Sequence, residues 1–169
     1  YVYGRFFKRR DTLLRAYLRG RGEAIPPLDW ARMNERYSLY LERCPTISPE
    51  FAEPEVRWER LEAEVFEIAL NKLAHRAALR ILRPRVVLLA GQDAWGLLPR
   101  DPRESEDVSR QVRPDSRMPC PVTLERLALE PGAPSLLVVR CNFLGKPYGP
   151  NSDEEIIRLG EIVGAAAVK

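Results

Sequence analysis

Two loops in the sequence carry residue types that could recognise a ligand. Residues 91–96 follow an apolar run and contain one carboxylate, Asp93, and residues 142–151 follow a second apolar run. Glycines in both loops allow a backbone to approach a ligand closely. Asp93 could orient a water molecule or cap a helix. In the second loop, Lys146 and Tyr148 could contact a phosphate and a base, or lie in solvent.

The amino-terminal segment is strongly basic. Among residues 1–21 there are seven arginine or lysine side chains and one acidic side chain, with aromatic residues between them. This combination is typical of segments that pair phosphates and stack bases. The expected DNA contacts in this segment are Arg5, Lys8, Arg9, Arg10 and Arg15. The alternative is an amphipathic helix that packs on the core, because apolar residues recur here at helical spacing.

Length and composition indicate one globular domain over residues 1–169. The chain has 169 residues, of which 45% are apolar and 30% are charged, as in ordinary soluble domains. It contains neither an apolar run of about 20 residues nor the apolar stretch of a signal peptide. We therefore expect a cytoplasmic protein. Because the sequence opens at Tyr1, we also expect that upstream sequence is missing.

Cysteine and histidine usage argues against a metal site. The three cysteines, Cys44, Cys120 and Cys141, are far apart, and His75 is the only histidine. This pattern suggests neither a disulfide framework nor zinc ligands. The glycine motifs that cradle nucleotide phosphates are also missing from the sequence. We therefore expect no metal and no cofactor.

The elements that must position these residues follow from periodicity. Helices are predicted over 4–18, from a cap at Asp29 through 35, over 55–82, and from 153 to about 167 after the capping residue Ser152. Apolar runs at 86–90 and 136–139 predict strands buried on both faces, and 122–129 alternates weakly as a third strand. Residues 99–121 are rich in proline and charge, which predicts an exposed loop.

These elements predict an α/β fold, a three-layer sandwich with a short, mainly parallel sheet flanked by helices. In an open parallel sheet, ligands bind beyond the carboxyl ends of the strands. Both loops follow predicted strands, so we expect them to form one site.

Two stretches resemble parts of the uracil-DNA glycosylase superfamily. Residues 81–91, Ile-Leu-Arg-Pro-Arg-Val-Val-Leu-Leu-Ala-Gly, resemble the step from helix to strand in that superfamily. Residues 136–142, with the loop and helix that follow, are similar to its last strand and its DNA-intercalating loop. The resemblance covers residues 51–163 in outline. It implies a DNA-binding domain that takes a flipped base into a pocket.

The resemblance allows two registers. In one, residues 86–90 form the third of four parallel strands, and the family's water-activating loop would precede Tyr1. In the other, residues 91–96, Gly-Gln-Asp-Ala-Trp-Gly, are similar to that loop, whose pattern is G-Q-D-P-Y-H-G. The second register implies that Asp93 positions or activates water. It assigns to the base pocket Gly91, Gln92 and Trp95.

The end of the last strand departs from the family pattern. There the family has H-P-S, whose histidine stabilises charge on the uracil oxygen, whereas this chain has Asn142-Phe143-Leu144. Asparagine can donate a hydrogen bond but carries no positive charge, so less stabilisation is available. The resemblance therefore implies Asp93 and Asn142 as catalytic residues and weak or lost base excision.

The sequence as a whole predicts a domain that binds nucleic acid or a nucleobase, with DNA as the expected partner. The alternative is a non-catalytic Rossmann-like interaction module whose basic amino terminus contacts a protein. The sequence does not indicate an oligomeric state.

Overall fold

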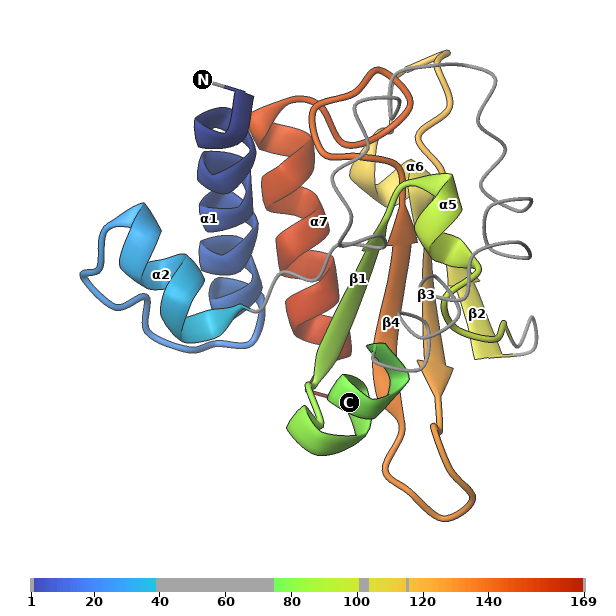
Figure 1. The fold of residues 1–169 in the computed structure, drawn as a ribbon. Helices are drawn as coiled ribbons and strands as arrows, with labels where there is room; N and C mark the ends of the chain where they lie inside the picture. The colour runs from blue at the N-terminus through green and yellow to red at the C-terminus, as the bar shows by residue number, and fades with distance from the viewer. Residues whose placement is uncertain (1, 39–74, 101–103, 115, 169) are drawn as a thin grey trace.

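The computed structural model describes residues 2–38, 75–100, 104–114 and 116–168 (Figure 1). They form a mixed α/β fold in which helices flank a four-stranded sheet. The elements in chain order are α1 (Val2–Gly20), α2 (Trp30–Tyr37), a helical segment at 75–82, β1 (Val86–Ala90), α5 (Gln92–Trp95), β2 (Ser105–Asp107), α6 (Ser109–Val112), β3 (Val122–Leu127), β4 (Leu136–Cys141) and α7 (Asp153–Ala166). Residues 55–74 of the predicted long helix lie outside the described residues.

Local side chains set the starts of two predicted helices, and both helices are confirmed. Asp29 caps α2, because its Oδ1 accepts a hydrogen bond from the backbone N–H of Arg32 at 2.9 Å. Ser152 caps α7 in the same way, accepting from the backbone N–H of Glu155 at 3.1 Å. Acidic residues in the first turn of α7 also complement the helix dipole.

The sheet has the strand order β1-β4-β3-β2 and is mixed. β1 and β4 are parallel, with Val86 opposite Leu137 and Ala90 opposite Cys141. The β4–β3 and β3–β2 pairs are antiparallel. The expected mainly parallel sheet is therefore not found in the described residues. The reason is that residues 128–135 join β3 directly to β4, whereas a parallel pair needs a longer crossover.

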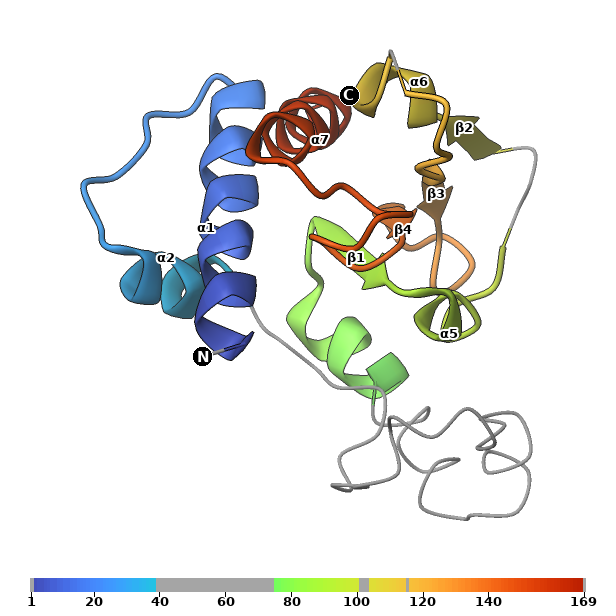
Figure 2. The ribbon, with the colours of Figure 1, turned by 90° about the horizontal axis from the view of Figure 1, so that it is seen from above.

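Apolar side chains cover both faces of the sheet. β4 is an interior strand whose six residues are all buried, as predicted. Leu137 and Val139 pack in one cluster with residues of α6 and α7, and Leu136 and Val138 pack in a second cluster on the opposite face, with residues of α5. Figure 2 shows α7 and α5 on opposite sides of the strands. β1 was expected to be buried on both faces, but it lies at the edge of the described sheet and is mostly half-buried.

Helix α1 packs closely along α7, and glycines make this approach possible. A Cβ on Gly160 would lie 2.5 Å from the Cβ of Ala16, and one on Gly164 would lie 2.2 Å from the carbonyl oxygen of Tyr17. Both distances are shorter than van der Waals contact. The close packing fixes the basic face of α1 relative to the loop that precedes α7.

The segment at 99–121 differs from its prediction as an exposed loop. It contains β2 and α6, and it buries Val108, Val112 and Cys120. These three residues pack in the core cluster, whereas Met118 of the same segment is exposed. The high content of proline and charge therefore gave no sign of a segment that connects the sheet to α7. None of the described helices has the combination of length and apolar character needed to cross a bilayer.

Candidate functional site

The two candidate loops lie side by side at one end of the parallel strand pair. Because β1 and β4 run in the same direction, residues 91–96 and 142–151 leave the sheet at the same edge. The backbone N–H of Gly91 donates to the carbonyl oxygen of Cys141 at 2.8 Å and continues the ladder for one residue. The sequence-based placement of both loops at carboxyl ends of parallel strands is confirmed.

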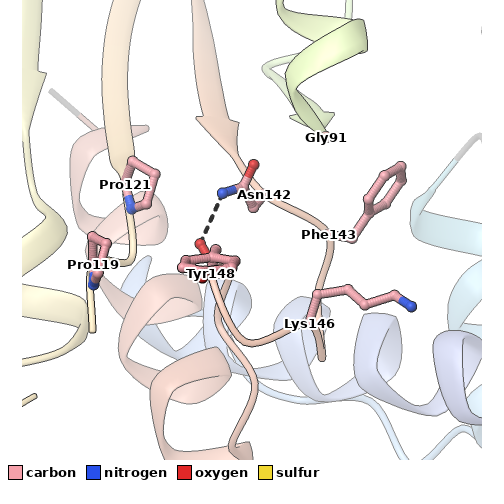
Figure 3. Close-up of a pocket in the computed structure, with 7 residues that line it drawn as sticks. All are labelled: Gly91, Pro119, Pro121, Asn142, Phe143, Lys146 and Tyr148. Carbon is pink, nitrogen blue, oxygen red and sulfur yellow. Dashed lines mark hydrogen bonds between the residues drawn. The ribbon is translucent and has the colours of Figure 1, made fainter. Parts of the chain in front are cut away.

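A pocket of about 430 Å³ lies at this edge. Its lining consists of one residue from the first loop, four from the second, and two prolines, namely Gly91, Pro119, Pro121, Asn142, Phe143, Lys146 and Tyr148. Figure 3 shows the two prolines on one side of the pocket and Phe143 on the other, with Asn142 and Tyr148 between them. Phe143 is 47% exposed and Tyr148 is 58% exposed. The pocket therefore presents aromatic surface to solvent.

Glycine is required at position 91 for two reasons. Its φ of 96° lies in a region that L residues rarely adopt. In addition, a Cβ there would lie 2.7 Å from ring atoms of Phe143. The Phe143 ring thus rests directly on the backbone of Gly91, and this contact joins the two loops at the pocket.

Hydrogen bonds to backbone carbonyl oxygens give the second loop a defined shape. The side-chain amide of Asn142 donates to the carbonyl oxygen of Tyr148 at 2.9 Å (Figure 3). The N–H of Gly145 donates to Pro150 at 2.6 Å, and the N–H of Gly149 donates to Lys146 at 2.9 Å. Asn142 therefore has a structural role in this loop, and its amide nitrogen is engaged.

A buried ion pair between α6 and α7 holds this loop through hydrogen bonds to its backbone. The Nε and Nη2 of Arg113 donate to the two carboxylate oxygens of Glu155 at 2.6 and 2.8 Å. The same guanidinium donates to the carbonyl oxygens of Gly149 at 2.8 Å and Pro147 at 3.0 Å. Glu155 also accepts from the backbone N–H of Asn151 at 2.8 Å. Arg113 therefore ties α6, the second loop and the start of α7 together.

Electrostatics around this ion pair follow from the contacts. The hydrogen bonds from Arg113 lower the pKa of Glu155, and those to Glu155 raise the pKa of Arg113.

Burial raises the pKa of Cys120, which lies between the two pocket prolines. Burial also raises the pKa of Cys141 to about 12. Both thiols are therefore protonated and unsuited to nucleophilic chemistry at neutral pH.

Trp95 does not line the pocket, in contrast to its expected role. It packs in the apolar cluster with Leu136 and Val138, and its indole N–H donates to the carbonyl oxygen of Cys141 at 3.1 Å. The carbonyl oxygen of Trp95 accepts from the buried Arg140, whose Nε also donates to Glu125 at 3.0 Å. These contacts hold α5 against the sheet. The side chains of Gln92 and Asp93 lie outside the described residues, although both belong to α5.

The basic residues of the amino-terminal segment separate into two groups. Arg10 is 8% exposed and donates to the Ser38 hydroxyl, and Arg15 donates to Asp11 at 2.9 Å and to a backbone carbonyl. These two arginines hold the helices together, as the amphipathic alternative predicts. Lys8 is exposed, and Arg9 reaches the second loop, donating to the carbonyl oxygen of Asn151 at 3.5 Å. The side chain of Arg5 lies outside the described residues.

Several residues of the site were missed by the sequence analysis. Phe143, Pro119 and Pro121 line the pocket, and Arg113 with Glu155 supports it. Phe143 could have been included because it follows Asn142 directly, but no sequence pattern links Arg113 to Glu155. Among the described residues, no cluster of three or more histidine, cysteine or acidic side chains is placed to hold a metal ion. Comparisons with protein families, curated proteins and solved structures give no match.

Proposed function

We propose that this domain binds nucleic acid by taking one unpaired nucleobase into the pocket between residues 91 and 142–151. The observation that carries the proposal is the pair of exposed aromatic side chains, Phe143 and Tyr148, in a pocket that also has Lys146. Stacking of a base on an aromatic ring contributes about 1–3 kcal/mol. A lysine beside it supplies a charge for the attached phosphate. The prolines opposite Phe143 offer a second apolar surface for the base.

Base excision is proposed to be weak or absent. The Asn142 amide is neutral and is already donating to the Tyr148 carbonyl oxygen, so it provides little stabilisation for charge on a departing base. Loss of one such donor typically costs about 100- to 1,000-fold in rate. The resemblance to uracil-DNA glycosylases, with Asp93 as the residue that orients water, belongs to this proposal. So do a DNA-repair role and a cytoplasmic location.

Binding is tested by fluorescence anisotropy with labelled single-stranded oligothymidylate. Tyr148→Ala should weaken binding by about 5- to 100-fold, as expected from the loss of one stacking contact. Trp30→Ala is the matched control, because Trp30 is an aromatic residue on α2 that is 41% exposed and does not line the pocket. Equal affinities of both variants and the parent would contradict the proposed pocket. Binding of a protein in place of any nucleic acid would favour the interaction-module alternative.

Excision is tested on uracil-containing single- and double-stranded DNA, with alkaline cleavage of the abasic product as the readout. We expect little or no product. If slow excision occurs, Asp93→Asn should abolish it and leave DNA affinity nearly unchanged, because only the water-orienting carboxylate is lost. Vigorous excision by the parent chain would show that the missing histidine is less important than proposed.

A further inference from the structure

Two cations, Arg9 of α1 and Lys146 of the second loop, lie at or beside the pocket loop. Arg9 lies against the second loop so closely that a Cβ on Gly145 would be 1.4 Å from its Nη1. Gly145 is the neighbour of Lys146, which lines the pocket. In the described residues, neither Arg9 nor Lys146 forms an ion pair with a carboxylate, and the exposed Lys8 forms none either. Three cations of this region, Lys8, Arg9 and Lys146, therefore form no ion pair within the described residues.

The other described basic residues of α1 and its end are already paired. Arg10 and Arg15 donate within the α1 and α2 region. Arg19 pairs with Glu161 at 3.1 Å, and Arg21 pairs with Glu23 at 2.7 Å. The unpaired charge of α1 thus lies at the turn that contacts the pocket loop. Such a concentration of positive charge is stabilised by an external anion with regularly spaced charges.

The residues that follow the pocket loop are acidic. The first turn of α7 contains the exposed Asp153 and Glu154, of which Glu154 pairs with Arg158. Carboxylates at this turn repel phosphates. A polynucleotide with one base in the pocket is therefore expected to follow the exposed cations of α1 and to avoid these two carboxylates.

Building on the proposed function, we propose that the ligand is a single-stranded polynucleotide whose backbone runs from Lys146 across Arg9 to Lys8. A single strand is required because the faces of a base within a duplex are covered by its stacked neighbours, whereas Phe143 and Tyr148 offer their rings for stacking. A mononucleotide would use only the pocket and Lys146. A strand of several nucleotides would also reach Arg9 and Lys8.

The test compares thymidine monophosphate with an oligothymidylate of about eight nucleotides, in anisotropy competition at several salt concentrations. Lys8→Gln, alone and with Arg9→Gln, should weaken binding of the oligonucleotide and flatten its salt dependence while leaving the affinity for the monophosphate unchanged. Lys146→Gln should weaken both. Arg85→Gln is the matched control, since Arg85 is an exposed cation that precedes the amino end of β1, at the far edge of the sheet.

The outcomes distinguish a failure of the proposed strand path from a failure of the proposed base pocket. Equal affinity for the monophosphate and the oligonucleotide, or no effect of Lys8→Gln, would overturn the proposed path and leave the base pocket standing. Tighter binding of a blunt duplex than of the single strand would overturn the choice of a single strand. Failure of both ligands to bind would overturn the proposed function itself.

Discussion

Replacing Glu155 with glutamine should destabilise the protein much more than the loss of an exposed charge in the same helical turn. The side chains of Arg113 and Glu155 are 6% and 14% exposed. Removal of one member of a buried ion pair leaves an uncompensated charge and typically costs 3–5 kcal/mol. Arg113 would keep its contacts with the carbonyl oxygens of Gly149 and Pro147, so we expect about 3 kcal/mol for Glu155→Gln, at the low end of that range.

The same variant should show a defined pH dependence. Arg113 holds the pKa of Glu155 below its ordinary range, so the ionised carboxylate stabilises the folded state. This contribution is complete above the unfolded pKa of about 4.3 and is lost as the pH falls through the lower folded pKa. The difference in unfolding free energy between the parent and Glu155→Gln should therefore shrink from neutral pH to about pH 3.

Urea unfolding followed by circular dichroism measures both effects. Glu154→Gln is the control, because Glu154 lies in the same helical turn, is 73% exposed and pairs with Arg158 at the surface. It should cost less than about 1 kcal/mol. Equal losses for the two variants, or a difference that persists at acid pH, would refute the assignment of Arg113 and Glu155 as a buried anchor of the pocket loop.

Three further substitutions or modifications test the pocket and the sheet. Gly91→Ala should cost about 1–3 kcal/mol in urea unfolding because of its positive φ, whereas Gly96→Ala, at a negative φ and in open space, should change stability by less than about 0.5 kcal/mol. Val138→Asp places an unpaired carboxylate in the fully buried interior strand, so thermal melting should reveal a loss of several kcal/mol, and an unchanged melting temperature would contradict the sheet order. Cys141 should resist iodoacetamide in the folded state and react in urea, because burial raises its pKa to about 12, and peptide mapping checks this.

The sequence predicts the elements well where local signals suffice. Asp29 and Ser152 mark helix starts through capping, and the apolar run 136–139 identifies the interior strand. Strand direction cannot be predicted from such local signals, because it depends on how the connection between two strands crosses the sheet. The short link at 128–135 makes β3 antiparallel to β4, and an apolar pattern contains no information on direction.

The candidate site is only partly predictable, because some of its contacts join residues that are far apart in the sequence. The shared edge of both loops follows from the parallel pairing of two apolar runs, and four of the pocket residues were therefore expected, namely Gly91, Asn142, Lys146 and Tyr148. Trp95 was misplaced, because a short helix directs it into the apolar cluster. Arg113 and Glu155 are far apart in the chain, and only the packing of α6 on α7 brings them together.

The packing of α1 reduces the salt dependence of nucleic-acid binding that is expected from its charge. Consecutive residues of an α-helix are rotated by about 100°, so Arg9 meets the pocket loop while Arg10 turns to Ser38. Charge counting over residues 1–21 treats seven cations as equal, which would give a single-strand salt slope of about −5. If Lys8, Arg9 and Lys146, which form no ion pair within the described residues, are the cations that contact phosphates, the expected slope is about −2. A measured slope near the larger value would mean that nucleic acid also displaces the internal partners of Arg10, Arg15, Arg19 and Arg21. The packing of α1 would then not persist in the complex.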